Sequence, residues 1–296
     1  MRILHLDSGR ELRGGQWQVL YLLRGLCCLG HQVKLLARRD PELLRLAQEE
    51  GIDAQPARLI SARGFDLIHA HDARSHTLGL LMARGRVPLV VARRVAFPVR
   101  ANMASRLKYR RKAYFIAVSH FVEKTLLAAG ISAERIGVVY DGVPLSPPSD
   151  AQRAGVLALD STDPLKGKEL IQQAAKLAGV DVRFSCRLPE DLPTALLFVY
   201  ITESEGLGSA ALLAMAAETP VIASRVGGLP EVVEDKSCGL LTANDPRAIA
   251  DAILGLLGDP DLARRLAVEG RRRVEERFSV ERMVKETVRI YEKVLA

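Results

Sequence analysis

The feature that most constrains the fold is a strand, turn and helix pattern in the second half of the chain. Residues 196–201 form a short apolar run with β-branched and aromatic side chains, and residues 209–217 consist mainly of Ala, Leu and Met, which favour a helix. Between them lies Glu205-Gly206-Leu207-Gly208, whose glycines permit a tight turn with close backbone approach. Because a turn that leads into a helix directs free backbone N–H groups toward a ligand, the pattern predicts an anion-binding site.

The same alternation of strands and helices runs along the whole chain. Residues 2–6 and 32–37 are predicted strands on either side of a helix over 17–29, and Gly14-Gly15 is predicted to form the turn before that helix. A unit of this kind implies a parallel sheet. Further strands are predicted at 66–71, 88–92, 136–140, 155–159, 180–185, 196–201, 220–223 and 239–241.

One segment interrupts this alternation and indicates a domain boundary. Residues 141–150 contain three prolines and two serines directly after an apolar strand. We therefore place a first domain at 1–144 and a second at 145–280, followed by a C-terminal helix in 281–296. A chain of 296 residues with 48% hydrophobic composition is large enough for two α/β cores.

Cysteine usage and hydropathy bear on the compartment. None of the four cysteines forms a Cys-x-x-Cys pair, so we expect small apolar side chains in a reducing environment, with no metal site and no disulfide framework. The N-terminus becomes polar too soon for a signal peptide, and no apolar run approaches the roughly 20 residues that a bilayer crossing needs. These features predict a cytoplasmic protein that does not span a membrane.

The order of the motifs resembles that of the retaining glycosyltransferase family 4. Residues 205–208, 214–216, 220–224 and 226–233 resemble the donor half of that family, and residues 14–19, 30–33, 66–71, 116–119 and 139–143 resemble its first half. The resemblance implies the GT-B fold, in which two Rossmann-like α/β domains face each other across a cleft. It also implies that the last helix, around 283–295, packs back on the first domain. Only 27 residues separate Leu177 from Glu205, so the second domain is expected to be reduced by a strand and a helix.

The resemblance further implies a nucleotide-sugar donor site and retaining, metal-independent transfer, with no cofactor beyond the donor substrate. Glu205 would hold hydroxyls of the transferred sugar, and Lys166 would pair with the pyrophosphate. Read without the resemblance, Lys166 is a solvated lysine, Glu205 a loop or capping acid, and the glycine pair a simple turn. The implied donor-binding residues are Gly14, Gly15, Lys166, Gly206, Leu207, Gly208 and Ser209.

Several positions depart from the family pattern. Leu213 stands where the family has a glutamate for the ribose, Ser161 where it has an arginine for the diphosphate, and Glu218 where it has a glycine. Arg94 takes the place of a histidine that contacts the donor sugar. These departures keep a second function open, a catalytically impaired homologue that acts as a binding or partner subunit. A nucleotide-sugar epimerase would need a second acid/base carboxylate, and we identify only Glu205.

Two histidines lie near the end of one predicted strand. His69 and His71 alternate along residues 66–71 and therefore share a face of the sheet. His71 is nearer the carboxyl end of the strand, where ligands bind in open parallel sheets, so it joins Glu205 as a candidate catalytic residue. His69 is expected to be a core histidine.

Basic residues are concentrated in residues 84–112, which contain ten Lys or Arg and no acid, although the whole chain carries a net charge of only +7. An ordinary solvated surface is one interpretation, and no nucleic-acid motif or aromatic platform accompanies the run. We expect instead an acceptor or membrane face that meets anionic lipid headgroups or a lipid-linked glycan. The predicted function is sugar transfer to a lipopolysaccharide- or envelope-glycan-type acceptor by a cytoplasmic, peripherally membrane-bound enzyme. The residues assigned to this face are Arg94, Arg106, Lys108, Arg110 and Arg111.

Overall fold

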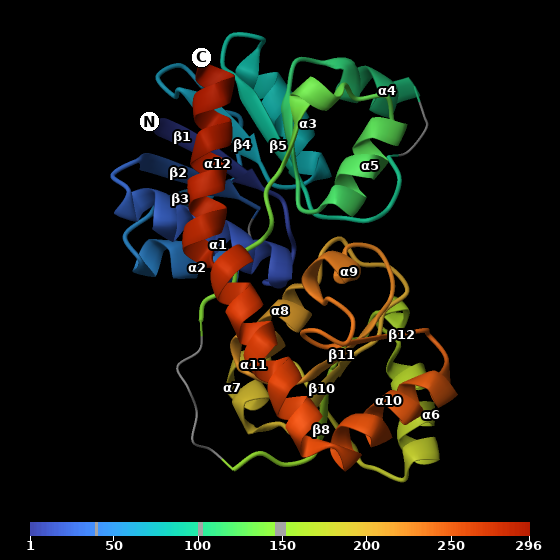
Figure 1. Ribbon diagram of the computed structural model, residues 1–296. Coiled ribbons are helices and arrows are strands. Elements are labelled where there is room, and N and C mark those ends of the chain that lie inside the picture. The colour runs from blue at the N-terminus through green and yellow to red at the C-terminus, as the bar shows by residue number, and fades with distance from the viewer. Residues whose placement is uncertain (39–40, 100–102, 146–151) are drawn as a thin grey trace. The chain divides into compact units, whose positions relative to one another are not determined.

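The computed structural model describes residues 1–38, 41–99, 103–145 and 152–296 (Figure 1). Within helices, the side chains of Pro41, Ala104, Ser105, Arg106 and Arg110 lie outside this description. The predicted linker at 141–150 is described only as far as residue 145.

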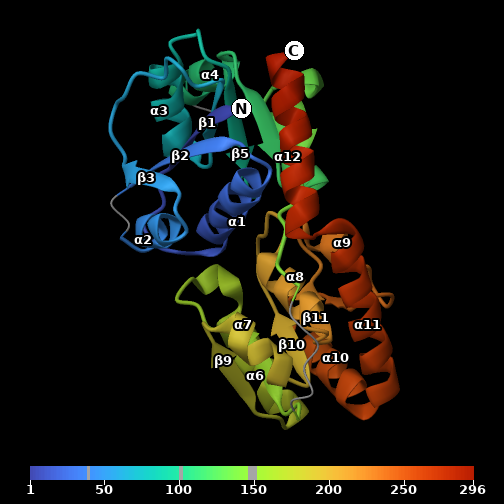
Figure 2. The same ribbon diagram turned by 90° about the vertical axis from the view of Figure 1, so that its left-hand side faces the viewer.

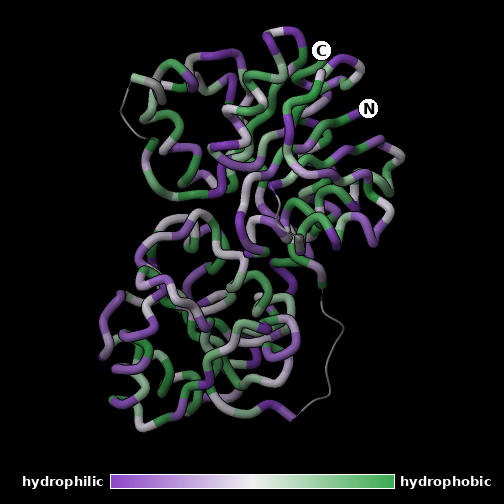
Figure 3. Tube along the Cα trace, turned by 180° about the vertical axis from the view of Figure 1, so that it is seen from behind, coloured by the Kyte–Doolittle hydropathy of each residue, from purple (hydrophilic) through white to green (hydrophobic). Residues whose placement is uncertain are grey.

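The chain divides into two compact units. Unit 1 comprises Met1–Gly142 and Val280–Ala296, and unit 2 comprises Val143–Ser279. The chain thus passes from one unit to the other between residues 142 and 143, and returns between residues 279 and 280. In both units the strands are largely apolar, and hydrophilic segments are frequent in the loops and on the helices (Figure 3).

Unit 1 is a seven-stranded parallel sheet in the order β3-β2-β1-β4-β5-β6-β7. Helices cover both faces, with α1, α2 and α12 on one side and α3, α4 and α5 on the other (Figure 1). Its strands are β1 (Arg2–Asp7), β2 (Gln32–Ala37), β3 (Asp53–Pro56), β4 (Leu67–Ala70), β5 (Leu89–Arg93), β6 (Tyr114–Ala117) and β7 (Ile136–Val138). Its helices are α1 (Gly14–Cys28), α2 (Pro41–Glu49), α3 (Ala73–Ala83), α4 (Met103–Arg110), α5 (His120–Ala128), the short η1 (Ala133–Arg135) and α12 (Val280–Leu295).

The last helix belongs to unit 1 and packs beside α1 (Figure 2). A Cβ atom added to Gly25 of α1 would lie 2.4 Å from a methyl group of Val284, so the two helix backbones approach closely there. Tyr291 is fully buried and shares an apolar cluster with Leu22 and Ile3. The apolar face of α12 therefore completes the core of unit 1.

The start of α1 differs from the sequence-based prediction. Gly14 and Gly15 form the first turn of the helix, whereas a turn outside it was expected. The backbone of Arg13 is extended and acts as the N-cap, and its N–H donates to Gln16 Oε1 at 3.3 Å. Because this capping bond stops the helix at residue 13, the glycine pair takes up helical backbone and presents the N-terminal N–H groups itself.

Unit 2 is a five-stranded parallel sheet in the order β12-β11-β10-β8-β9. Helices α6 and α10 pack on one face, and α8 packs on β10 and β11 with α11 against it. Its strands are β8 (Val156–Leu159), β9 (Val182–Ser185), β10 (Leu197–Tyr200), β11 (Val221–Ser224) and β12 (Leu240–Thr242). Its helices are η2 (Pro164–Lys166), α6 (Lys168–Ala178), α7 (Leu188–Asp191), η3 (Leu192–Thr194), α8 (Ser209–Ala216), α9 (Leu229–Val232), α10 (Pro246–Gly258) and α11 (Pro260–Arg277).

The short stretch between α6 and β10 holds one strand, β9, and the two short helices α7 and η3. None of the helices in the described ranges combines the length and the hydrophobicity that a membrane crossing requires.

His76 of α3 provides a test of the core of unit 1. Its ring is fully buried against the edges of Tyr109 and Phe115, and neither ring nitrogen has a hydrogen-bond partner among the described residues. Burial, reinforced by the charges of Lys108 and Arg135, lowers the pKa of His76 to about 3. In the unfolded chain this histidine has a pKa near 6.5 and is protonated below that pH, whereas in the folded chain it stays neutral down to about pH 3. The free energy of unfolding therefore falls as the pH drops below about 6.5.

We expect His76→Leu to flatten the pH dependence of stability. Between pH 7 and pH 5, a buried neutral histidine of this kind should lower the free energy of unfolding by about 2 kcal/mol. The decline measured for the variant should therefore be smaller than the wild-type decline by that amount. Urea unfolding at several pH values, followed through the fluorescence of Trp17, measures unit 1 because Trp17 is the single tryptophan of the chain. An unchanged decline in the variant would mean that folded His76 takes up the proton.

Candidate active site

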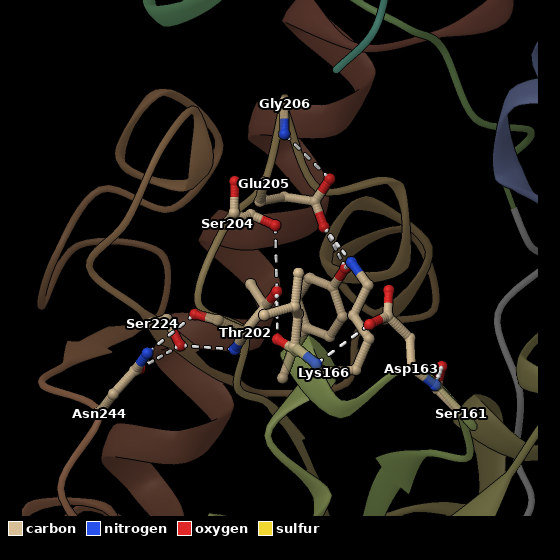
Figure 4. A network of polar contacts seen from close by, with 11 residues as sticks. Ser161, Asp163, Lys166, Thr202, Ser204, Glu205, Gly206, Ser224 and Asn244 are labelled. Atoms are coloured by element: carbon tan, nitrogen blue, oxygen red, sulfur yellow. Dashed lines mark hydrogen bonds and ion pairs between the residues drawn. The ribbon is translucent and has the colours of Figure 1, made fainter. Parts of the chain in front are cut away.

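The end of β10 and the turn that leads to α8 carry a compact polar network in unit 2 (Figure 4). Glu205 lies in the turn between β10 and α8, and its side chain is only 17% exposed. Its Oε2 atom accepts hydrogen bonds from Lys166 Nζ at 2.7 Å and from the hydroxyl of Tyr200. Its Oε1 atom accepts from the backbone N–H of Gly206 at 3.1 Å. Both carboxylate oxygens therefore have partners before any ligand is present.

Local chain geometry places Lys166 beside Glu205. The side chain of Asp163 accepts from the N–H of Leu165 at 3.0 Å and so caps the short helix η2, which ends at Lys166. Gly167 follows with φ 61° and turns the chain into α6; a Cβ there would lie 2.9 Å from the carbonyl oxygen of Ile201. The lysine ammonium also lies 5.4 Å from the ring centroid of Tyr200 and 3.1 Å from its hydroxyl.

Tyr200 is a site residue that the sequence analysis missed. It is the last residue of the buried strand β10 and was counted only as an apolar strand residue. Burial, together with the nearby charge of Glu205, raises the pKa of Tyr200 well above its ordinary value, so its hydroxyl keeps its proton and donates. The proximity of a buried tyrosine to the glutamate five residues later is a property of the turn, which residue types alone do not reveal.

A second set of hydrogen bonds fixes the start of the turn to neighbouring strand ends. The backbone N–H of Thr202 donates to Ser224 Oγ at 2.8 Å, Ser224 Oγ donates to Asn244 Oδ1 at 2.6 Å, and Asn244 Nδ2 donates to the Thr202 carbonyl at 2.9 Å. This ring of bonds joins the carboxyl ends of β10, β11 and β12 (Figure 4). The turn that carries Glu205 is thus held at the edge where open parallel sheets bind ligands.

The other end of the turn rests on a pair of glycines. Gly228 N–H donates to the carbonyl oxygen of Glu205 at 3.0 Å. A Cβ at Gly227 would lie 2.0 Å from that same oxygen, and a Cβ at Gly228 would lie 2.1 Å from the carbonyl oxygen of Gly206. The backbones of the two loops therefore touch at a distance that no side chain permits.

The donor-binding residues predicted for unit 2 come together in this network or directly beside it. Glu205 contacts both Lys166 and Gly206. Gly208 is the N-cap of α8, which begins at Ser209. Leu207 is buried. Gly14 and Gly15 lie in unit 1, in the first turn of α1, and Gly15 has open space where a Cβ would be. Their part in donor binding stays a prediction.

In unit 1 a cluster of buried histidines lies at the ends of β1 and β4. His71 Nε2 and His5 Nδ1 are 3.0 Å apart, and Arg94 Nη1 is 3.4 Å from His71 Nδ1. Because a guanidinium can only donate, His71 Nδ1 accepts, His71 donates through Nε2, and His5 carries its proton on Nε2. Burial is the main cause that holds the pKa of His71 well below its ordinary value and lowers that of His5 to about 3. His69 bonds to Tyr291 at 2.6 Å.

These histidines also raise the question of a metal site. One nitrogen from each of His5, His69 and His71 lies within 4.8 Å of the others, and neutral imidazoles are good ligands for zinc. The contact between His5 and His71 already uses one nitrogen of each ring, and Arg94 places a positive charge beside them. The donor set therefore fits a hydrogen-bonded core cluster better than a cation site. His71, which was predicted to be catalytic, contacts the guanidinium of Arg94 in this arrangement.

The predicted basic face needs correction at Arg94. The Arg94 side chain is 17% exposed and forms an ion pair with Asp141 at 2.9 Å, at the carboxyl edge of the sheet. Arg93 is also buried and bonds to the hydroxyl of Tyr109 at 3.2 Å. Of the ten cations in residues 84–112, Arg94 is therefore paired with a carboxylate that is distant in sequence, and Arg93 is buried beside Tyr109 of the same run.

The remaining residues of that face lie on or just after α4. Lys108 Nζ donates to the carbonyl oxygen of Ala73, and Arg111 is exposed. Arg106 and Arg110 belong to α4, but their side chains lie outside the described residues.

We expect Gly227→Ala to disrupt the Glu205 turn. The added methyl group would overlap the Glu205 carbonyl oxygen, and the positive φ of 57° is itself unfavourable for alanine. A loss of about 2–4 kcal/mol of unit 2 stability follows from these two effects. Gly255→Ala is the matched control, since its Cβ meets no atom within 4 Å and alanine favours a helix.

The buried thiol of Cys238 gives the readout, since it lies in unit 2. Its labelling rate should rise in Gly227→Ala and stay level or fall in Gly255→Ala. Equal rates in the two variants would show that the glycine contact does not hold the turn. The measurement requires that the exposed cysteines be replaced by serine, namely Cys27, Cys28 and Cys186.

Family models match both units. A model described as Glycosyltransferase Family 4 matches residues 12–147, and one described as Glycosyl transferases group 1 matches residues 157–259.

Curated relatives match a shorter stretch. Alpha-maltose-1-phosphate synthase of Mycolicibacterium smegmatis is 44% identical over 117 residues, which are 37% of this chain and 30% of the relative. N-acetyl-alpha-D-glucosaminyl L-malate synthase of Bacillus anthracis is 37% identical over 100 residues, which are 33% of this chain and 26% of the relative. The matches thus span less than a third of the length of these relatives.

Solved structures match almost the whole chain. The crystal structure of Anabaena Alr3699/HepE in complex with UDP and glucose has a TM-score of 0.85 at 19% identity and covers 99% of this chain and 100% of that one. A glycosyltransferase from Rickettsia africae has a TM-score of 0.82 at 18% identity and covers 99% and 98%. At such identities the likeness shows the fold, which is the GT-B fold. With the two family models in the expected order along the chain, the protein belongs to glycosyltransferase family 4.

Proposed function

We propose that the protein is a retaining glycosyltransferase that moves a sugar from a nucleotide-sugar donor to an envelope-glycan or lipopolysaccharide-type acceptor. The observation that carries this proposal is the contact of Lys166 and Glu205 at the turn before α8. In this contact a cation lies beside a carboxylate, and the proposal assigns the cation to the diphosphate and the carboxylate to sugar hydroxyls. The complexes of Alr3699/HepE with UDP and UDP-glucose support the same donor class.

Each residue has a defined part in this proposal. The ammonium of Lys166 and the N–H groups at the start of α8 would neutralise the charge that grows on the diphosphate as it leaves. Glu205 would accept hydrogen bonds from two sugar hydroxyls and so orient the anomeric carbon. We propose that these groups serve without a metal ion or cofactor, because the chain itself supplies the positive charge beside the phosphate.

The proposed chemistry is front-side replacement. The bond between the anomeric carbon and the phosphate oxygen breaks, and the acceptor oxygen bonds to the same face of that carbon. The acceptor proton passes to the departing phosphate. The proposal uses Glu205 as the carboxylate at the sugar, because Glu205 contacts Lys166 and Tyr200. The other carboxylate of the network, Asp163, caps η2 through the N–H of Leu165, so the proposal assigns no glycosidase-like carboxylate pair.

The second candidate is a homologue that binds the donor without turnover. Ser161 Oγ accepts the N–H of Asp163 at 3.2 Å and brings no charge to the site. Leu213 lies in α8, partly exposed, and provides no hydrogen-bond acceptor for a ribose. Weak nucleotide affinity without hydrolysis or transfer would favour this candidate.

The acceptor and the location are proposed on chemical grounds. A lipid-linked or envelope acceptor is held at a membrane, so an enzyme that uses one would work at the inner face of the cell membrane as a peripheral protein. Transfer assays with lipid-linked and soluble acceptors distinguish this class from small soluble acceptors.

Lys166→Ala should weaken the binding of a nucleoside diphosphate. The loss of a charge-assisted contact costs on the order of 1.5–3 kcal/mol, which is about a 10- to 150-fold rise in Kd by calorimetry. Lys168→Ala is the matched control, since Lys168 lies two residues away and pairs with Asp160 on the surface. Equal affinity in both variants and the wild type would remove Lys166 from the site.

Glu205→Gln should separate binding from turnover. The amide keeps the shape of the side chain but loses the charge that holds sugar hydroxyls, so kcat should fall by at least about 100-fold. Affinity for the nucleoside diphosphate, which lacks the sugar, should change far less. The measurement is donor turnover over a panel of nucleotide sugars, and a fully active variant would contradict the assigned role.

A further inference from the structure

A groove with a volume of about 1160 Å³ lies in unit 1. Its walls come from the second half of α3, the loop between α3 and β5, and the segment from α4 into β6. Arg135 before β7 and Val294 of α12 complete the lining. All of these elements belong to unit 1, so the groove is a property of that unit alone.

The groove carries only positive charge. Its lining includes six cations and no Asp or Glu, and none of the six forms an ion pair within the part of the chain that the structure describes. Arg135 is fixed by its own bonds, since its guanidinium donates to the carbonyl oxygens of Arg111 and Ala113 at 2.6 and 2.8 Å. The cations of the lining are Arg84, Arg86, Lys108, Arg111, Lys112 and Arg135.

Apolar side chains lie among these cations. Leu81 of α3 and Leu107 of α4 both line the groove and are each 59% exposed. Leu80 and Val87 add to the apolar wall. Exposed leucines beside unpaired cations are typical of a surface that meets the interface of a bilayer.

The groove lies at the opposite edge of the sheet from the candidate site residues of unit 1. Its lining includes Leu89 and Tyr114, which begin β5 and β6. Arg94 follows the carboxyl end of β5, and a five-residue strand spans about 15 Å. Among the described residues the basic run therefore divides between two edges, and Arg84, Arg86, Arg111 and Lys112 lie away from the edge where parallel sheets bind their substrates.

From these observations we propose that the groove binds the phosphate headgroup and adjoining methylenes of an anionic membrane lipid, as an attachment site separate from the acceptor site. The four exposed cations of the lining, Arg84, Arg86, Arg111 and Lys112, match the phosphate, and the exposed leucines match the hydrocarbon beside it. Lys108 and Arg135 are engaged with backbone carbonyl oxygens. A nucleic acid fits less well, because Tyr114 is the single aromatic residue of the lining and is held by Lys293 at 3.1 Å and by the Ile136 carbonyl. The proposal goes beyond sugar transfer and does not depend on it.

The experiment compares sedimentation of the full chain with phosphatidylglycerol vesicles and with phosphatidylcholine vesicles. The test variant replaces Arg86, Arg111 and Lys112 by Gln, all exposed residues of the groove. Each cation should contribute roughly fivefold, so affinity for phosphatidylglycerol should fall about 100-fold. The matched control carries the same charge change on exposed cations of unit 1 outside the groove, Arg58, Arg63 and Lys124, each replaced by Gln.

The proposal is supported if the groove variant loses binding, the control variant keeps most of it, and Leu107→Ser weakens binding to vesicles. It is overturned if both triple variants lose binding equally, since the attraction would then be diffuse. Equal binding to both vesicle types would also overturn it. Complete competition by millimolar glycerol phosphate would identify a free phosphate as the ligand, and competition by a single-stranded oligonucleotide at the same groove would identify a nucleic acid. Nucleoside diphosphate affinity should stay unchanged in the groove variant, which separates this test from the donor site.

Discussion

The candidate donor site depends on a close approach between two loop backbones that only glycine allows. Gly227 and Gly228 contact the carbonyl oxygens of Glu205 and Gly206, at distances where any Cβ would overlap. The contact leaves the N–H groups at the start of α8 at the head of the turn and aims the Glu205 side chain at Lys166. A hydrogen bond from Gly228 to the Glu205 carbonyl closes the same contact. The chemistry of the site therefore rests on two residues without side chains.

The charges of the site are balanced before a ligand binds. Glu205 and Lys166 are about one-fifth exposed, and each would be costly to leave alone in such surroundings. In the proposed reaction, a diphosphate that paired with Lys166 would take over part of the interaction of Lys166 with Glu205, and sugar hydroxyls would then donate to the released carboxylate. In this view the ion pair is exchanged for ligand contacts, and Tyr200 keeps Glu205 in place during the exchange because its hydroxyl remains protonated.

Ten of the twelve strands in the described ranges could be predicted from the sequence, because short apolar runs between turns have few alternatives in a parallel sheet. The strands β3 (Asp53–Pro56) and β6 (Tyr114–Ala117) were not predicted. The expected run at 196–201 is β10, Leu197–Tyr200, and the expected run at 32–37 is β2. The start of α1 was wrong because a capping bond between Arg13 and Gln16 outweighs the usual preference of a glycine pair for a turn. Local propensity gives no weight to such a bond.

The candidate site was predictable where residue type and local order suffice, as for Glu205 and Lys166. It was not predictable where a partner is distant in sequence. Asp141 lies 47 positions from Arg94, and their contact removes a cation from the surface. Charge counted along a sequence cannot reveal this pairing, because it depends on the order of strands in the sheet.

The division of the basic run follows from the direction of one strand. The polypeptide enters β5 after Arg84 and Arg86, and leaves it at Arg93 and Arg94. Because a strand carries the chain across the full width of the sheet, cations that are neighbours in sequence are delivered to opposite edges. At the carboxyl edge Arg94 contacts Asp141 and His71, and Arg93 is buried beside Tyr109. Arg84 and Arg86, at the amino edge, form no ion pair among the described residues, so they can attract an anion from outside at the edge opposite the ion pair of Arg94 and Asp141.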